Sequence, residues 1–75
     1  MKALLEEVFI EWQTARTKHA PLNSAHEAYA VILEEVEEFW AETMKKRAER
    51  DKANMRKELI QIAAMACRAI ADLEL

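Results

Sequence analysis

The sequence predicts an all-α protein in which one domain, residues 1–75, contributes three helices to an oligomeric helical bundle. Apolar residues recur with helical spacing in three segments. A proline-containing stretch separates the first two segments, and a run of charged residues separates the last two. The composition, 52% hydrophobic and 33% charged, is that of a folded globular chain. A single core of this length gives little stability, which favours assembly of several copies.

The first helix is expected from about residue 2 to residue 18. Its apolar stripe consists of Leu5, Val8, Phe9, Trp12 and Ala15. The segment His19–Asn23 ends it, because Pro21 cannot continue a helix and disfavours the α conformation at Ala20.

The second helix is expected to begin at Ser24, which forms a capping box with Glu27, and to run to about Arg47. Its aromatic residues Tyr29, Phe39 and Trp40 lie on the apolar side, where core packing is expected. The charged residues 47–52 are interpreted as a short turn or as a distorted continuation of the helix.

The third helix is expected from about residue 51 to residue 74, antiparallel to the second because the connection is short. It is apolar nearly all round between Leu59 and Ala71, so we expect it to be central and partly covered by a second chain. Cys67 lies in this apolar run and is expected to be buried.

Composition excludes several classes of function. The formal charge of -3 argues against a nucleic-acid partner, and the longest apolar run is too short and too interrupted to cross a membrane. The acidic N-terminus is not a signal peptide, so we expect a cytoplasmic protein. Because the chain has no glycine, a glycine-rich phosphate loop is absent, and any phosphate must be held by a metal ion and basic side chains.

The second helix carries a face of carboxylates, in which Glu34, Glu38 and Glu42 follow one another at four-residue spacing. Each such like-charge contact costs about 0.2–0.5 kcal/mol in a helix. One interpretation is an ordinary solvated face. The other is a divalent cation site, since hard oxygen ligands suit Mg²⁺ or Mn²⁺ and a cation would offset the repulsion.

Antiparallel pairing extends this face to the third helix. With the turn near Glu49 and Arg50, Gln61 should lie level with Glu38, and Glu58 level with Ala41. Glu58 and Gln61 are three residues apart and share one face. We therefore expect one oxygen cage made by Glu35, Glu38, Glu58 and Gln61.

The motif Glu34-Glu35-x-x-Glu38 followed by Glu58-x-x-Gln61 resembles that of the MazG-like nucleotide pyrophosphohydrolases, an all-α nucleoside triphosphate pyrophosphatase group. The resemblance covers about fifty residues, from SAHEAYAVILEEVEEFWAE to KELIQIAAMACRAIADL. It implies a Mg²⁺-dependent (or Mn²⁺-dependent) homodimer or homotetramer that cleaves nucleoside triphosphates to monophosphate and pyrophosphate.

The same resemblance implies roles for individual residues. Glu35, Glu38 and Glu58 would bind the metal, and Glu34 would orient or deprotonate the attacking water. The family usually has aspartate where this chain has Gln61, whose amide oxygen is a neutral ligand. A non-catalytic helical assembly module is the alternative function.

Three basic residues are candidates for substrate phosphates. Lys46 and Lys57 belong to a basic end of the helical hairpin, which is equally typical of a solvated turn. Arg68 interrupts the apolar run of the third helix. It is expected either to pair with Asp72 four residues later or to contact a phosphate.

Overall fold

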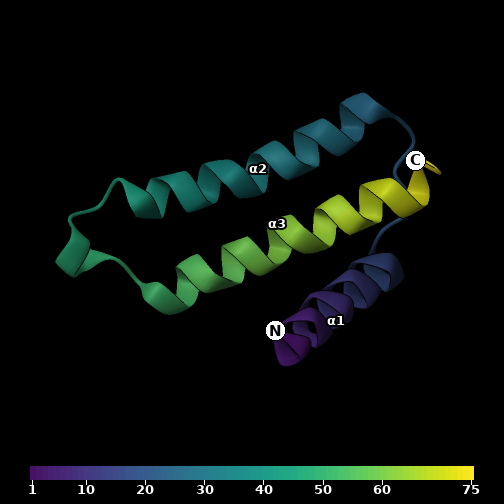
Figure 1. Ribbon diagram of the computed structural model, residues 1–75. Helices are drawn as coiled ribbons and strands as arrows, with labels where there is room; N and C mark the ends of the chain where they lie inside the picture. Colours follow the sequence, from purple (N-terminus) through teal and green to yellow (C-terminus); the bar gives the residue numbers. More distant parts are fainter.

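The computed structural model describes all 75 residues and contains three α-helices, α1 (Lys2–Lys18), α2 (Ala25–Thr43) and α3 (Lys52–Asp72). A single 3-10 turn, η1 (Arg47–Glu49), lies in the connection between α2 and α3. Helices α2 and α3 run antiparallel, and α1 lies along the other side of α3 (Figure 1). The predicted all-α class, the three helical segments and the central position of α3 are therefore confirmed.

Small residues in the middle of α3 allow both neighbouring helices to approach closely. Ala64 is completely buried, next to Met65 and to Ala15 of α1. A second cluster, nearer the C-terminus, joins Ala69 to Ala28 of α2 and to Leu22 of the α1–α2 connection. Larger apolar side chains that are only partly buried pack around the first cluster, namely Val8, Trp12, Val31 and Ile32.

The start of α2 is capped much as its sequence predicts. The Oγ of Ser24 accepts a hydrogen bond from the backbone N–H of Glu27 at 3.1 Å. The Glu27 carboxylate accepts in return from the N–H of Asn23 at 3.0 Å, one residue earlier than in the usual capping box. The Ser24 hydroxyl and the Glu27 carboxylate each accept from a backbone N–H group that has no partner within the helix.

Helix α2 ends at Thr43, earlier than the predicted end at Arg47. The reason is Arg50, whose guanidinium donates to the Thr43 carbonyl at 2.7 and 3.1 Å and to the Lys45 carbonyl at 3.2 Å. These bonds satisfy carbonyl groups that a helix end leaves without partners. In a chain without glycine, an arginine side chain takes the place of a glycine C-cap.

The buried carboxylate of Glu42 fixes the other side of the same connection. It accepts from the backbone N–H of Asp51 at 2.6 Å and from the Lys45 ammonium at 2.9 Å. Both hydrogen bonds lower the pKa of Glu42, and the one from the Asp51 backbone has the larger effect. The connection therefore lies earlier in the chain than expected, and Glu58 comes beside Glu35 and Glu38 instead of beside Ala41.

One apolar face of the hairpin has no neighbour within the chain. Tyr29 and Trp40 are 67% and 59% exposed, so the expectation that they pack in the core of this chain is wrong. Cys67 is exposed as well, in an open apolar groove that it lines together with Val8 and Trp12 of α1. None of the three helices has both the length and the apolar character needed to cross a bilayer.

Candidate metal centre

Three glutamates meet between α2 and α3, and we refer to Glu35, Glu38 and Glu58 as the acidic triad. Glu35 and Glu38 are three residues apart on α2 and therefore share one face of the helix. Glu58 reaches them from α3. One carboxylate oxygen from each residue lies within 4.8 Å of the others.

Two members of the triad have a carboxylate oxygen that is buried and has no hydrogen-bond donor beside it. Glu58 is only 6% exposed, and Glu35 is half-buried. One oxygen of each, the Oε2 atom, is shielded from water and has no hydrogen-bond partner. A buried, unpaired carboxylate oxygen is costly, so these two atoms indicate that the folded chain leaves room for a positively charged partner.

The crowding of carboxylates changes their acidity. Burial raises the pKa of Glu35 to about 8, together with the hydrogen bond that a protonated Glu35 donates to Glu58 and with the negative charges of Glu38 and Glu58. The pKa of Glu38 is also raised, chiefly by hydrogen bonding to Glu58, although the nearby Lys57 ammonium opposes the shift. Without a cation, the triad therefore holds a proton at neutral pH.

The donor set fits a small hard cation. Mg²⁺ binds oxygen ligands at about 2.0–2.1 Å in an octahedron, which places neighbouring ligand oxygens roughly 3 Å apart. The triad oxygens need only a small closure to reach that separation. Three carboxylates without histidine or cysteine suit Mg²⁺ or Mn²⁺ better than Zn²⁺ or Cu²⁺.

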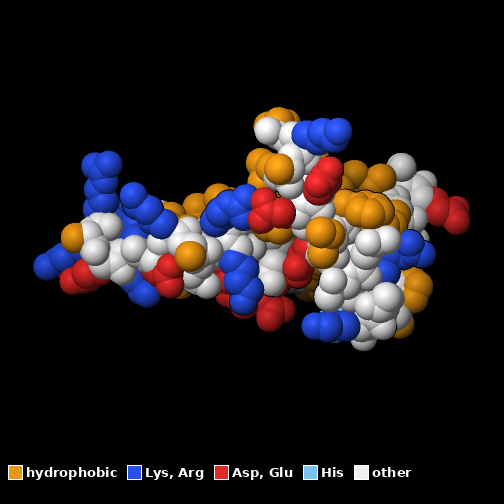
Figure 2. Space-filling view, turned by 90° about the horizontal axis from the view of Figure 1, so that it is seen from below, with side chains coloured by type: hydrophobic (Ala, Val, Ile, Leu, Met, Phe, Trp, Pro, Cys, Tyr) orange, Lys and Arg blue, Asp and Glu red, His pale blue; other side chains and the backbone are white.

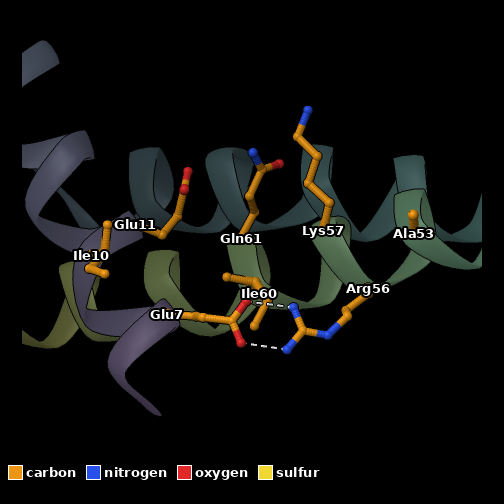
Figure 3. Close-up of a pocket in the computed structure, with 8 residues that line it drawn as sticks. All are labelled: Glu7, Ile10, Glu11, Ala53, Arg56, Lys57, Ile60 and Gln61. Atoms are coloured by element: carbon orange, nitrogen blue, oxygen red, sulfur yellow. Dashed lines mark hydrogen bonds and ion pairs between the residues drawn. The ribbon is translucent and has the colours of Figure 1, made fainter. Parts of the chain in front are cut away.

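Gln61, the fourth member of the expected cage, lies on α3 three residues after Glu58. It lines a groove between α1 and α3 together with Lys57 and Glu11, and Figure 3 shows these three side chains pointing to the same side. Below them in Figure 3, Arg56 forms two hydrogen bonds with Glu7 of α1, one of 2.7 Å. Gln61 also lines a second cavity together with Glu35, so it lies beside the triad on the α1 side.

The other residues predicted for the site, apart from Arg68, are exposed and lie at different distances along the chain from the triad. Glu34 is exposed on α2 next to Glu35 and outside the triad. Lys57 is exposed too, but its charge acts on Glu38. Lys46 is the exposed residue that precedes η1, in the α2–α3 connection. Lysine and arginine side chains gather at this end of the molecule, at the left of Figure 2.

Arg68 is buried, with 5% of its surface exposed. Its Nε lies 3.5 Å from Asp72, so the expected pair on α3 is present. Its Nη2 donates to the carbonyl of Ala20 at 2.8 Å, and Asp72 accepts from the N–H of Leu22 at 2.9 Å. The pair therefore ties the α1–α2 connection to α3.

A group of residues near the triad was not predicted from the sequence. The cavity that contains Glu35, Gln61 and Arg68 is closed by the C-terminal half of α1, and we call it the α1 recess. Helix α1 and His19, the residue that follows it, contribute one wall of the recess. The residues of this wall are Glu11, Thr14, Ala15, Lys18 and His19. The spacing of Thr14 and Lys18, four residues apart, places them on one face. Which face meets α3 depends on the packing of the whole helix.

The triad offers three carboxylates that could hold a divalent cation, beside a cavity lined mainly by polar side chains. This arrangement suits reactions of anionic oxygen compounds, in which a cation offsets negative charge. Comparisons of the chain with protein families, curated proteins and solved structures gave no match.

The raised pKa of Glu35 predicts that metal-free protein loses stability as the pH rises. The unfolded chain releases this proton near the ordinary value of 4.5, whereas the folded chain keeps it to about 8. Between these values the folded state binds more protons, so the free energy of unfolding falls with increasing pH. Thermal melting in EDTA should show this decline, and Glu35→Gln should make it shallower and raise the Tm at pH 8.

Glu37→Gln is the matched control, because Glu37 is an exposed glutamate on the same helix outside the triad. It should keep the slope of the natural protein. Equal slopes for Glu35→Gln and the natural protein would show that Glu35 titrates normally.

Proposed function

We propose that the protein is a metal-dependent nucleoside triphosphate pyrophosphohydrolase, which uses Mg²⁺ or Mn²⁺ and cleaves between the α and β phosphates. The observation that carries the proposal is the acidic triad, with its two buried carboxylate oxygens that have no partner. The resemblance of its motif to that of the MazG-like pyrophosphohydrolases supplies the reaction. Both lines of reasoning converge on Glu35, Glu38 and Glu58.

The side chains around the triad support distinct roles. Glu35, Glu38 and Glu58 hold the cation, which when bound offsets charge on the phosphates in the transition state. Glu34 stands next to Glu35 and is open to solvent, so its carboxylate can accept a proton from a water molecule. Gln61 brings an amide to the edge of the site instead of a fourth carboxylate, which reduces the negative charge that meets the substrate.

The uncovered apolar face supports a homodimer or homotetramer as the active form. Large apolar side chains on the outer side of α2 are more than half exposed at Tyr29, Trp40 and Met44. On α3, Leu59 and Ile70 are half exposed as well. Such extended apolar surface in a small chain is typical of an interface between subunits. This same surface favours the alternative function, a non-catalytic assembly module.

Hydrolysis is the direct test of the proposal. Purified protein with Mg²⁺ should convert at least one triphosphate, from a panel of ribonucleotides and deoxyribonucleotides, to monophosphate and pyrophosphate, measured by phosphorus NMR. Glu58→Gln should lower kcat/KM by about 100-fold, because it replaces a negatively charged ligand with a neutral amide. Glu34→Gln should lower kcat by about 100-fold or more if Glu34 activates water.

Glu37→Gln should keep full activity, since this residue lies outside the triad on the same helix. The absence of turnover with every nucleotide, in protein that is folded and loaded with Mg²⁺, would contradict the enzymatic proposal and support the assembly module.

The assembly is tested by sedimentation equilibrium at micromolar concentration, where the natural protein should be a dimer or tetramer. Trp40→Lys should shift it toward monomer, because the substitution puts a charge into the apolar interface while the side chain is exposed within one chain. A folded, monomeric natural protein at this concentration would contradict an oligomeric enzyme.

A further inference from the structure

The α1 recess lies directly against the acidic triad. It has a volume of about 240 Å³ and is bounded by the C-terminal half of α1, by the middle of α3 and by Glu35 of α2. Glu35 belongs both to the triad and to the wall of the recess. A ligand bound at the triad can therefore extend along Glu35 into the recess.

The floor of the recess contains a buried arginine whose hydrogen-bonding capacity is not exhausted. Arg68 is 5% exposed, and its Nη1 contacts only the sulfur of Met65 at 3.9 Å. Its distance to the carboxylate of Asp72 is 3.5 Å, longer than in a bidentate pair. A guanidinium has five N–H donors, and a thioether is a weak acceptor, so Nη1 can still donate to an anion while Asp72 and the Ala20 carbonyl take the other side of the group.

Other groups in the recess suit the same ligand. Lys18 at the end of α1 brings a second positive charge, and the hydroxyl of Thr14 can donate a hydrogen bond. Glu11 at the rim is the one carboxylate besides Glu35. A cation on the triad would offset part of the negative charge around Glu35, so that Lys18 and Arg68 can attract an anionic group into the recess against the charge of Glu11.

We propose that the α1 recess binds a phosphate group of a polyphosphate chain that continues onto the acidic triad, with Lys18 and Arg68 as its charged donors. The inference rests on the proposed function for the placement of the neighbouring phosphates. It assigns the phosphate contacts to the α1 side of the triad, and not to the basic α2–α3 end that contains Lys46. Lysine supplies a point charge here and arginine supplies directed N–H groups.

Calorimetric titration with inorganic tripolyphosphate in the presence of Mg²⁺ tests this assignment without requiring turnover. Lys18→Gln should weaken binding at least about tenfold, as expected for loss of a charged hydrogen bond. Because Lys18 is exposed, the fold should survive the substitution. Lys18→Arg should keep most of the affinity. Lys2→Gln makes the same charge change at the far end of α1 and should bind like the natural protein.

Equal affinity of Lys18→Gln and the natural protein for tripolyphosphate would overturn the inference, as would the absence of any binding at millimolar tripolyphosphate. A loss of affinity of the same size in Lys2→Gln would overturn it too, since it would show only an effect of net charge. A second titration with a nucleoside triphosphate that carries a methylene group between the α and β phosphates should show the same dependence on Lys18.

The inference and the proposed function can fail separately. If binding depends on Lys18 but no nucleotide is hydrolysed, the recess is a phosphate site and the enzymatic proposal is wrong. If nucleotides are hydrolysed with the same KM by Lys18→Gln and the natural protein, the enzymatic proposal stands and the recess assignment is wrong.

Discussion

The register between α2 and α3 decides which side chains meet, and hydrogen bonds in their connection set it. Arg50 holds the last carbonyls of α2, and the buried Glu42 accepts from the backbone of Asp51 just before α3 begins. Together they fix where one helix stops and the next starts. A displacement of α3 by one turn, about 5.4 Å, would separate Glu58 from Glu35 and Glu38. The acidic triad therefore depends on two side chains that do not belong to it.

The triad places carboxylates where the chain gives them few partners. Two of its oxygens are shielded from water without hydrogen bonds, and the pKa of Glu35 is raised to about 8. Such an arrangement lowers the stability of the metal-free fold, because like charges repel and a carboxylate is poorly solvated there. A bound cation offsets both terms. Cation binding at this site, as proposed, would therefore be coupled to folding.

Much of the fold follows from local signals in the sequence. Pro21 ends the first helix, Ser24 and Glu27 begin the second, and the apolar run between Leu59 and Ala71 predicts a central third helix. The pairing of Glu35 with Glu38 likewise follows from helical spacing alone. In contrast, the end of α2 was misplaced, because the capping of its carbonyls by Arg50 is a contact between side chain and backbone across the turn. No residue near Arg47, the expected end of the helix, indicates this contact.

Features that depend on the packing of whole helices were not predictable. Gln61 lines a cavity together with Glu35 and with residues of α1, and helical spacing along α3 does not indicate that α1 takes part. Lys18 reaches the α1 recess only through the way α1 lies on α3. Trp40 and Cys67 are apolar by type but exposed, since a periodic pattern identifies an apolar face without showing which chain covers it.

The central claim, that the acidic triad is a divalent cation site, is tested most directly by locating the ion. Crystals of the natural protein grown with Mn²⁺ should show an anomalous peak among the carboxylates of Glu35, Glu38 and Glu58, with oxygen distances of about 2.0–2.3 Å. Crystals of Glu38→Gln grown in the same way should show a weaker peak or none. A triad without an ion in crystals saturated with Mn²⁺, or an ion bound only elsewhere, would contradict the claim.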